Sequence, residues 1–506
     1  MTITIAAVLL CLASFFVVQI LGAGLVDDTY IFLRYAENFA SGHGPVFNPC
    51  ERVEGYSSPL WMVLLTIVGA CGADLVVASR VLSSLLGFGL PLVILLAFGR
   101  GKTDQFVAAL AAAAFLATHP TNAFWSWTGM DTALFAFLSL LTLILVVGKS
   151  PLTPSSAGLA GLAFSSSALA RPEALAFLPV YLFYLYFSDT GSARERLRVS
   201  IGFLAPLVFV AVHFGVRRIY YGSWLPNTFY AKANIERTVL LSSGAEYLLS
   251  FLAANFIPVI LFAALLILAL VRRQTPRAPW LLLAALVFTA ISTTVSLGGD
   301  HFPLHRFLLP TLAFISYGLA RGFGELTHWF PNVAGLRIAI PTVVVIALLG
   351  VSNSLLVQRS APETHAQVEM AERWSEVGLW FHDNTAPDAT MASIVVGAIP
   401  YYSGLECIDL LGLTDTTISR DGSVYPEGAV GHQRYHTDYV LSRQPTYIVF
   451  NQSGLYDEPS SRIGLRHAYA LWDIIQDPRA STLYNLRTVT MTNARVILFL
   501  ELIDQG

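Results

Sequence analysis

Two adjacent carboxylates near the start of the chain are the first groups that suggest chemistry. Asp27 and Asp28 follow 26 residues without a charged side chain and precede apolar residues at helical spacing. A general base needs an ionised carboxylate that is held still and faces its substrate. Paired carboxylates at a membrane edge are costly unless they are hydrated, paired or functional. The pair is therefore predicted to be catalytic; a divalent cation bound there is left open, and the structural alternative is that Asp28 caps the following helix.

Three cations are candidates for binding an anionic group. Lys232 ends a run rich in aromatic residues, Arg306 follows Asp300 in a polar loop, and Arg171 stands between two apolar runs. An ammonium or guanidinium at the level of lipid headgroups suits a phosphate, and the candidates rank as Lys232, Arg306 and then Arg171. The structural alternatives are a lysine that snorkels to the interface, a salt bridge between Asp300 and Arg306, and pairing of Arg171 with Glu173 at a helix end.

The same loops contain polar and aromatic residues that suit a sugar, because carboxylates and amides bind hydroxyls and aromatic faces cover sugar rings. The candidates for sugar or acceptor contact are His43, Glu54, Tyr56, Asn227, Tyr230 and Asp300. No metal site is predicted. Asp300, His301 and His305 have suitable side chains, but Pro303 argues against a regular helix through both histidines. The four cysteines have no zinc or redox spacing.

The composition indicates that a membrane positions these residues. The chain is 55% hydrophobic and 12% charged, and soluble domains carry about twice that charged fraction. The net charge of −3 gives no basic excess for nucleic acid. Eleven apolar runs predict an all-α polytopic domain with about 11 transmembrane helices, at residues 3–25, 80–99, 105–118, 132–148, 156–170, 174–188, 200–216, 247–271, 279–297, 307–320 and 338–356.

The basic residues predict the orientation of these spans. Pro59–Ala70 is too short to span and is expected to be an interfacial helix in the first outer loop. Alternate connections, near 100–104, 149–155, 189–199, 272–277 and 321–337, hold 11 Lys/Arg in 46 residues, whereas the opposite loops hold 8 in 104. The first set is therefore predicted to be cytoplasmic. An odd number of spans then places the C-terminus outside the cytoplasm, and all the candidate residues lie in outer loops.

A change in charge density predicts two domains. Residues 1–356 contain 35 charged side chains, and residues 357–506 contain 28 in 150 positions. The first part is predicted to be the catalytic transmembrane domain and the second a small soluble α/β domain, with a helix over 364–384 and strands over 390–397 and 446–450. The polar residues of the second part read as ordinary loop residues, namely Asp409, Asp415, His432 and Asp438. This segment is expected to bind or orient an acceptor rather than to perform chemistry.

Several blocks, in order, resemble a known family. The first outer loop contains Asp27-Asp28-Thr29-Tyr30-Ile31, Arg34-Tyr35-Ala36, Gly42 to Pro49 and Glu51 to Tyr56, and later blocks are Leu225 to Lys232, Gly299 to Phe307 and Ile408 to Leu413. Together they resemble membrane glycosyltransferases of the GT-C superfamily, and are most similar to the mycobacterial terminal arabinofuranosyltransferases and their bacterial relatives. Two departures are Cys50, where relatives commonly have glycine, and Asp131, where they commonly have glutamate.

The resemblance implies a polyprenyl-phosphate-linked sugar as donor, with arabinofuranose as the candidate sugar, and an extracytoplasmic glycan or lipid as acceptor. It implies an inverting transfer with an aspartate of the first outer loop as base, which is Asp27 or Asp28 here; no cofactor is certain, and a divalent cation at the aspartate pair is possible. It also implies a multi-pass protein of the bacterial inner membrane. The alternative is a transporter or flippase of lipid-linked sugars. Transporters usually show internal repeats, and the sequence shows none.

Overall fold

The computed structural model describes residues 2–99, 103–148, 152–187, 192–232, 235–272, 276–329, 335–451, 453–454, 465–493 and 495–503. The predicted cytoplasmic connections lie partly outside these residues. The chain forms two compact units. The helical unit consists of Met1–Ala23, Arg80–His213 and Thr238–His365, and the mixed unit of Gly24–Ser79, Phe214–Arg237 and Ala366–Gly506. The mixed unit thus joins the predicted first outer loop to the C-terminal segment. The predicted division at residue 357 stays a prediction.

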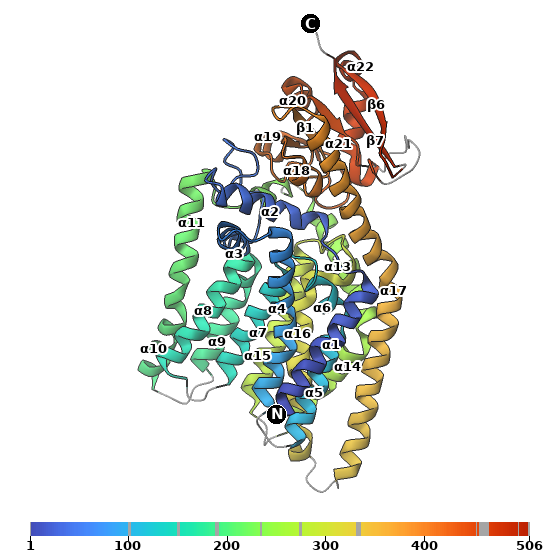
Figure 1. The fold of residues 1–506 in the computed structure, drawn as a ribbon. Coiled ribbons are helices and arrows are strands. Elements are labelled where there is room, and N and C mark those ends of the chain that lie inside the picture. The colour runs from blue at the N-terminus through green and yellow to red at the C-terminus, as the bar shows by residue number, and fades with distance from the viewer. Residues whose placement is uncertain are drawn as a thin grey trace. The chain divides into compact units, whose positions relative to one another are not determined.

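The helical unit is built from apolar helices whose buried faces carry many alanines. In Figure 1 these helices run alongside one another, and α16 packs against both α5 and α7. Small side chains let helix backbones approach closely where no hydrophobic effect drives association. Its elements are α1 (Thr2–Leu21), α5 (Thr103–Thr118), α6 (Pro120–Trp125), α7 (Thr132–Val147), α8 (Pro154–Ala170), η1 (Pro172–Phe177), α9 (Leu178–Phe187), α10 (Ala193–Leu204), η2 (Ala205–Leu207), α13 (Arg237–Ala254), α14 (Phe256–Val271), α15 (Arg277–Ser296), η3 (Pro303–Leu308) and α16 (Leu309–Trp329).

Each of the eleven predicted apolar runs overlaps a helix. Within the described residues, five helices are long and apolar enough to cross a membrane, or six if one bent pair is a single span. The chain is therefore a multi-pass membrane protein, while the exact number of crossings stays a prediction. The interfacial helix predicted over Pro59–Ala70 is α3, with the same bounds.

The bent pair corrects one predicted span. The run 247–271 was expected to be continuous, but α13 and α14 meet at an angle of 86° at Asn255. At the break, the Asn255 side chain donates to the carbonyl of Phe251, and its Oδ1 lies 2.7 Å from Nε2 of the buried His119. Pro258 in the first turn of α14 has no N–H group, so it cannot continue the hydrogen bonds of α13 across the bend.

Among the described residues, three helices have at least one full turn in each unit. They are α4 (Leu75–Phe98), α11 (Val208–Tyr221) and α17 (Gly335–Asn384). Helix α17 contains both the last predicted span and the predicted helix over 364–384 in 50 uninterrupted residues. The rise in charge density near residue 357 therefore occurs within one helix and does not mark the end of an element.

The mixed unit contains a five-stranded sheet with the order β2-β1-β5-β7-β6. Strands β2, β1 and β5 are parallel, and β7 pairs antiparallel with β5 and β6. Leu471, Ile448 and Leu498 lie in its buried core. The elements are α2 (Asp27–Ala40), α3, α12 (Asn227–Ala231), β1 (Thr390–Ser393), α18 (Ala398–Ser403), β2 (Glu406–Asp409), α19 (Thr416–Asp421), β3 (Ser423–Val424), β4 (Arg434–Tyr435), α20 (Thr437–Arg443), β5 (Tyr447–Val449), α21 (Leu465–Gln476), α22 (Pro478–Leu483), β6 (Tyr484–Thr490) and β7 (Val496–Leu502).

Candidate active site

The two predicted catalytic aspartates open helix α2 in the mixed unit. The helix begins at Asp27, its N-cap is Val26, and no side chain caps it. The structural alternative that Asp28 is the cap is therefore wrong, although both carboxylates favour the positive end of the helix dipole. The helix ends at Ala40, and Gly42 follows with φ of 85°. Glycine adopts this left-handed conformation without a steric penalty.

Backbone N–H groups of the C-terminal segment hold the Asp27 carboxylate. Oδ1 accepts a hydrogen bond from Ala398 N at 2.7 Å, and Oδ2 accepts one from Gly397 N at 3.2 Å. Burial raises the pKa of Asp27 to about 7; the two N–H groups lower it and the charge of Asp28 raises it further. A carboxylate offers about four lone-pair positions, so these two bonds leave capacity to accept a proton. Asp27 is thus fixed in place and has a pKa close to neutral pH.

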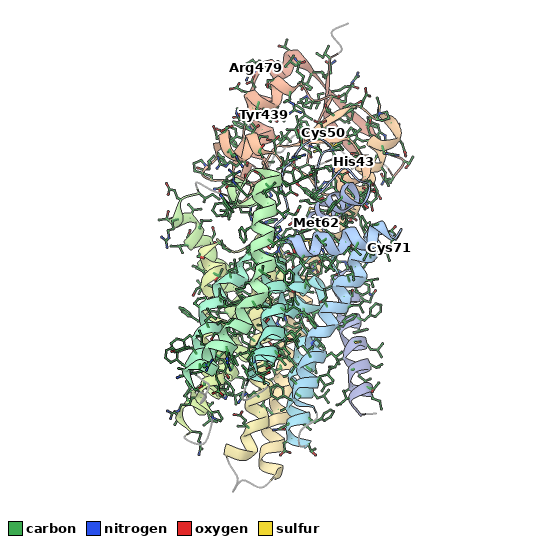
Figure 2. The ribbon with its side chains drawn as sticks, turned by 90° about the vertical axis from the view of Figure 1, so that its left-hand side faces the viewer. His43, Cys50, Met62, Cys71, Tyr439 and Arg479 are labelled. Carbon is green, nitrogen blue, oxygen red and sulfur yellow. The ribbon has the colours of Figure 1, made fainter. Side chains whose placement is uncertain are left out.

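The predicted sugar-binding residues of the first loop have partners within the mixed unit. Both Glu54 and Arg217 are buried, and Glu54 accepts two hydrogen bonds from the guanidinium, at 2.5 and 3.1 Å. The Tyr56 hydroxyl lies 3.0 Å from the Tyr221 hydroxyl. His43 is exposed in the turn after α2 (Figure 2). Sugar contact by these residues stays a prediction, and the structure gives Glu54 and Tyr56 a packing role as well.

The buried ion pair predicts a large effect on stability. Glu54→Gln leaves the Arg217 charge buried without a counter-charge, which typically costs about 3–5 kcal/mol. We expect the mutant to unfold at a clearly lower temperature than the wild type. Glu51→Gln is the control, because Glu51 lies 3.9 Å from Arg443 at the surface, and exposed pairs contribute about 0–1 kcal/mol. Equal melting temperatures for Glu54→Gln and the wild type would refute a structural role for this pair.

The run that ends at Lys232 docks onto the loop after β2. The amide of Asn227 donates to the carbonyls of Gly412, Leu413 and Asp415 at 2.8, 3.0 and 3.1 Å, and its Oδ1 accepts from Ser419 at 2.8 Å. This fully engaged side chain joins two blocks that the sequence resemblance had identified separately.

Residues on both sides of this contact, in the loop after β2 and in the run that ends at Lys232, also have partners. Asp409 is buried and accepts from the N–H groups of Leu411 and Thr414, which shapes the loop; burial raises the pKa of Asp409 to about 6. The guanidinium of Arg420 lies 4.8 Å from the Tyr230 ring. Lys232 itself is exposed. Phosphate contact by Lys232 and sugar contact by Tyr230 and Asn227 stay predictions.

Cys50 has a backbone conformation that favours glycine. Its φ is 71°, in the left-handed region. A non-glycine residue there carries strain of about 1–3 kcal/mol, so glycine would suit this backbone conformation better than cysteine.

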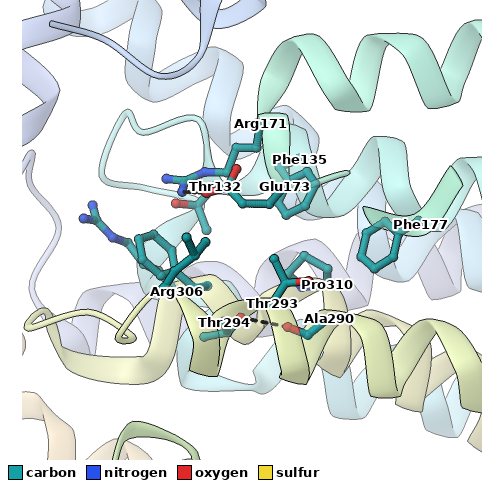
Figure 3. Close-up of a pocket in the computed structure, with 12 residues that line it drawn as sticks. Thr132, Phe135, Arg171, Glu173, Phe177, Ala290, Thr293, Thr294, Arg306 and Pro310 are labelled. Atoms are coloured by element: carbon teal, nitrogen blue, oxygen red, sulfur yellow. Dashed lines mark hydrogen bonds and ion pairs between the residues drawn. The ribbon is translucent and has the colours of Figure 1, made fainter. Parts of the chain in front are cut away.

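The other two predicted cations share a pocket in the helical unit. Figure 3 shows Arg171 and Glu173 on one side of the pocket and Arg306 approaching from another element. The guanidinium carbons of Arg171 and Arg306 lie 4.7 and 5.2 Å from the centre of the same Phe307 ring. The pocket, of about 30 Å³, is lined by Thr132, Phe135, Arg171, Glu173, Phe177, Ala290, Thr293, Thr294, Leu297, Arg306, Phe307 and Pro310.

Buried carboxylates hold both guanidinium groups; the partner of Arg306 is the predicted Asp300, whereas the hydrogen-bond partner of Arg171 is Asp131 and not the predicted Glu173. Asp131 accepts from Arg171 Nε at 3.2 Å and from Nη2 at 3.4 Å. Asp300 pairs with Arg306, accepting from Nη2 at 3.3 Å. Because a guanidinium has five N–H donors, a carboxylate that binds one edge fixes its orientation and still leaves donors for an anion. Pairing and anion binding are therefore compatible at these arginines.

Two polar atoms of the pocket are buried without a hydrogen-bond partner among the described residues. They are Thr132 Oγ1 and Glu173 Oε2, and Glu173 Oε1 is 3.7 Å from Arg171 Nη1. Leaving such groups unsatisfied costs about 1–3 kcal/mol each. A ligand with both anionic oxygens and hydroxyl groups would satisfy this lining.

The loop that carries Arg306 is strained. Leu304 and His305 have φ of 63° and 49° within η3, and consecutive left-handed residues other than glycine are rare. His305 Nε2 lies 2.6 Å from Ser250 Oγ. Strain of this kind persists where surrounding contacts impose it, often at functional sites.

The described residues contain no group of three His, Cys, Asp or Glu side chains arranged to hold a metal ion, and a cation at the aspartate pair stays a prediction.

Comparison with known proteins supports the resemblance. Residues 359–496 match a family described as a domain of unknown function, DUF8728. A terminal β-(1→2)-arabinofuranosyltransferase of Mycobacterium tuberculosis is 29% identical over 273 residues, which are 50% of this chain and 42% of that protein. The match therefore spans less than half the length of that relative.

Solved structures extend the similarity to the whole chain. ArnT from Cupriavidus metallidurans, bound to undecaprenyl phosphate, has a TM-score of 0.63 at 14% identity and covers 99% of this chain and 98% of its own. AftD from Mycobacteria, an arabinofuranosyltransferase, has a TM-score of 0.53 at 15% identity and covers 100% of this chain and 40% of its own. At these identities the likeness shows the fold. Since the fold matches over the whole chain and the sequence over half of it, this chain has the fold of the GT-C membrane glycosyltransferases.

Proposed function

We propose that this chain is a membrane glycosyltransferase that moves a sugar from a polyprenyl-phosphate donor to an extracytoplasmic glycan or lipid. The observation that carries the proposal is a polar pocket and an apolar cavity that are both lined by residues of α15 in the helical unit. Such a pair of sites suits an amphiphile with an anionic head and a long apolar tail. The sugar proposed is arabinofuranose, as in the relative from Mycobacterium tuberculosis.

The apolar cavity has a volume of about 620 Å³ and is lined by α9 and α15. Its lining residues are Pro179, Val180, Phe183, Tyr184, Phe187, Ala278, Leu281, Leu282 and Ala285. The arginine pocket uses Phe177, just before α9, and Ala290, further along α15. Five residues of helix separate Ala285 from Ala290, about 8 Å at 1.5 Å per residue. Phe183 is 67% exposed, so this part of the lining is accessible to a lipid chain from outside the protein.

The two arginines suit the head of such a donor. Each guanidinium keeps N–H donors that its carboxylate partner does not use, and a phosphate can accept hydrogen bonds from these donors. The pocket is small, so it admits phosphate oxygens and not a whole sugar. When the bond to the sugar breaks, negative charge grows on the phosphate, and fixed guanidinium groups stabilise it.

The aspartate pair supplies the base. The aspartate removes the proton of an acceptor hydroxyl, the acceptor oxygen forms a bond to the anomeric carbon, and the bond from that carbon to the phosphate oxygen breaks with inversion. Asp27 is the better supported of the two, because its carboxylate is fixed by two N–H groups and its pKa of about 7 matches the operating pH of a general base.

The C-terminal segment is proposed to be an extracytoplasmic α/β domain of an inner-membrane protein. The excess of basic residues in alternate connections supports this orientation. A reporter that is active only in the cytoplasm, fused after Gly506, is expected to give no signal. A strong signal would mean that the number of crossings is even.

One observation favours the alternative, a transporter or flippase of lipid-linked sugars. Transporters use broken helices, and α13 and α14 form one bent pair. The purified protein in liposomes distinguishes the two functions when it is supplied with a prenyl-phosphate sugar and an acceptor glycan. A transferase releases prenyl phosphate and forms a glycosidic bond in the acceptor. Movement of intact donor across the bilayer without either product would refute the transferase.

A further inference from the structure

We propose that the Gly397–Ala398 turn of the C-terminal segment positions the catalytic carboxylate of Asp27, so that this segment takes part in the transfer itself. The proposal rests on the function proposed above. It departs from the expectation that the C-terminal segment only binds or orients the acceptor. Gly397 and Ala398 are positioning residues, because they act through Asp27.

Both oxygens of the carboxylate are held by this turn. The N–H groups of two successive residues, Gly397 and Ala398, point at the two oxygens of Asp27. A pair of fixed donors sets both the position and the plane of the carboxylate. It also favours the charged form of the acid, which is the form that accepts the proton.

The approach requires glycine at position 397. A Cβ atom built on Gly397 would lie 2.0 Å from the Asp27 carbonyl oxygen and 2.6 Å from its Cγ and Oδ1. Such distances are far inside van der Waals contact, and a Cβ at this position would displace both the backbone and the carboxylate of Asp27. The backbone of the turn can therefore approach Asp27 this closely only because residue 397 has no side chain.

The same face of α2 is fastened to α18 at two further points. Positions 27, 30 and 34 share one face of a helix. The Tyr30 ring lies 5.6 and 5.5 Å from the rings of Tyr401 and Tyr402. Arg34 is buried and donates to the carbonyls of Pro400 and Leu405, the second at 2.7 Å. In Figure 1 α2 and α18 are neighbours within this unit. Three anchors on one face leave α2 little freedom to slide or rotate.

The ionisable groups around Asp27 are few among the described residues. Asp28 and Tyr30 come from α2, Tyr402 approaches from α18, and Tyr30 also bonds Ser375 of α17. Among these groups, Asp27 is the one whose pKa burial raises to about 7, close to neutral pH. A change in the acidic limb of the pH–rate profile therefore reports on its environment.

Ala398→Pro tests the proposal by replacing one N–H donor with the Cδ of the proline ring, which lies where Asp27 Oδ1 accepts the hydrogen bond. Proline is well tolerated at the first position of a helix, and Ala398 is the first residue of α18. Losing the shorter of the two bonds removes a contact that lowers the pKa of Asp27, so the pKa of the base rises. We expect turnover to fall about tenfold or more at pH 6 and to recover only in part at pH 9, because the ring also displaces the carboxylate, with donor binding unchanged. Thr416→Pro is the matched control, since Thr416 opens α19, another six-residue helix, and its profile should equal that of the wild type.

Gly397→Ala tests the fit by adding a methyl group. We expect turnover to fall about 100-fold at every pH, which is the effect of a misplacement of about 1 Å, with the KM for donor unchanged. Gly215→Ala is the control, because a Cβ there meets nothing within 4 Å. If Ala398→Pro keeps the wild-type profile while Asp27→Asn is inactive, the turn does not position the base. If both aspartate mutants are active, the proposed function itself is wrong.

Discussion

Asparagine in place of Asp27 is expected to lower the rate of sugar transfer by about 10²–10⁴-fold, the range that a positioned general base contributes. An amide has nearly the same shape but cannot accept the proton. Binding of the prenyl-phosphate donor should persist, because no donor contact is assigned to Asp27. The measurement is product formation by purified protein in liposomes, together with donor binding by the same preparation.

The pH dependence sharpens this prediction. Burial raises the pKa of Asp27 to about 7, so the base is protonated and idle below that pH and ionised above it. Turnover of the wild type should therefore rise with pH and level off above about pH 8. Asp28→Asn is the comparison. Loss of activity in Asp28→Asn, together with an active Asp27→Asn, would move the base to Asp28. Full activity in both mutants would remove the aspartate pair from the mechanism.

Loss of Arg306 is expected to weaken donor binding by about 10–150-fold, because a hydrogen bond to a charged group is worth about 1.5–3 kcal/mol. The single change Arg306→Gln is ambiguous, since it leaves the buried Asp300 without a counter-charge and destabilises the bundle. The informative variant is the double change Asp300→Asn with Arg306→Gln, which keeps the pair neutral. It should fold with a melting temperature near that of the wild type and bind the donor poorly.

A comparison with Lys232→Ala completes this test. Sequence reasoning ranked Lys232 above both arginines as the phosphate ligand, whereas Arg171 and Arg306 line a common pocket and Lys232 is exposed in the other unit. We therefore expect a smaller loss of donor binding in Lys232→Ala than in the neutral double mutant. Wild-type donor affinity in the double mutant, together with a large loss in Lys232→Ala, would restore the original ranking.

The sequence predicted features that depend on local pattern. Apolar runs predicted where the helices lie, because a helix in hydrocarbon must satisfy its backbone internally and present apolar side chains. The helix at Pro59–Ala70 has the predicted bounds. The pairing of Asp300 with Arg306 was also predicted, as the structural alternative, because six residues separate the partners. The aspartate pair was visible as two charges after a long apolar run.

The tertiary structure decided which partners these residues have. Asp27 accepts hydrogen bonds from Gly397 and Ala398, which are 370 and 371 residues away. The amide of Asn227 donates hydrogen bonds to the loop after β2. The sequence of the first loop gave no sign that Glu54 pairs with Arg217. Hydrophobic periodicity shows only which face of each segment is apolar and which is polar. The choice of partner across hundreds of residues depends on how the elements pack, and a buried polar group takes whichever donor or acceptor that packing brings within hydrogen-bond distance.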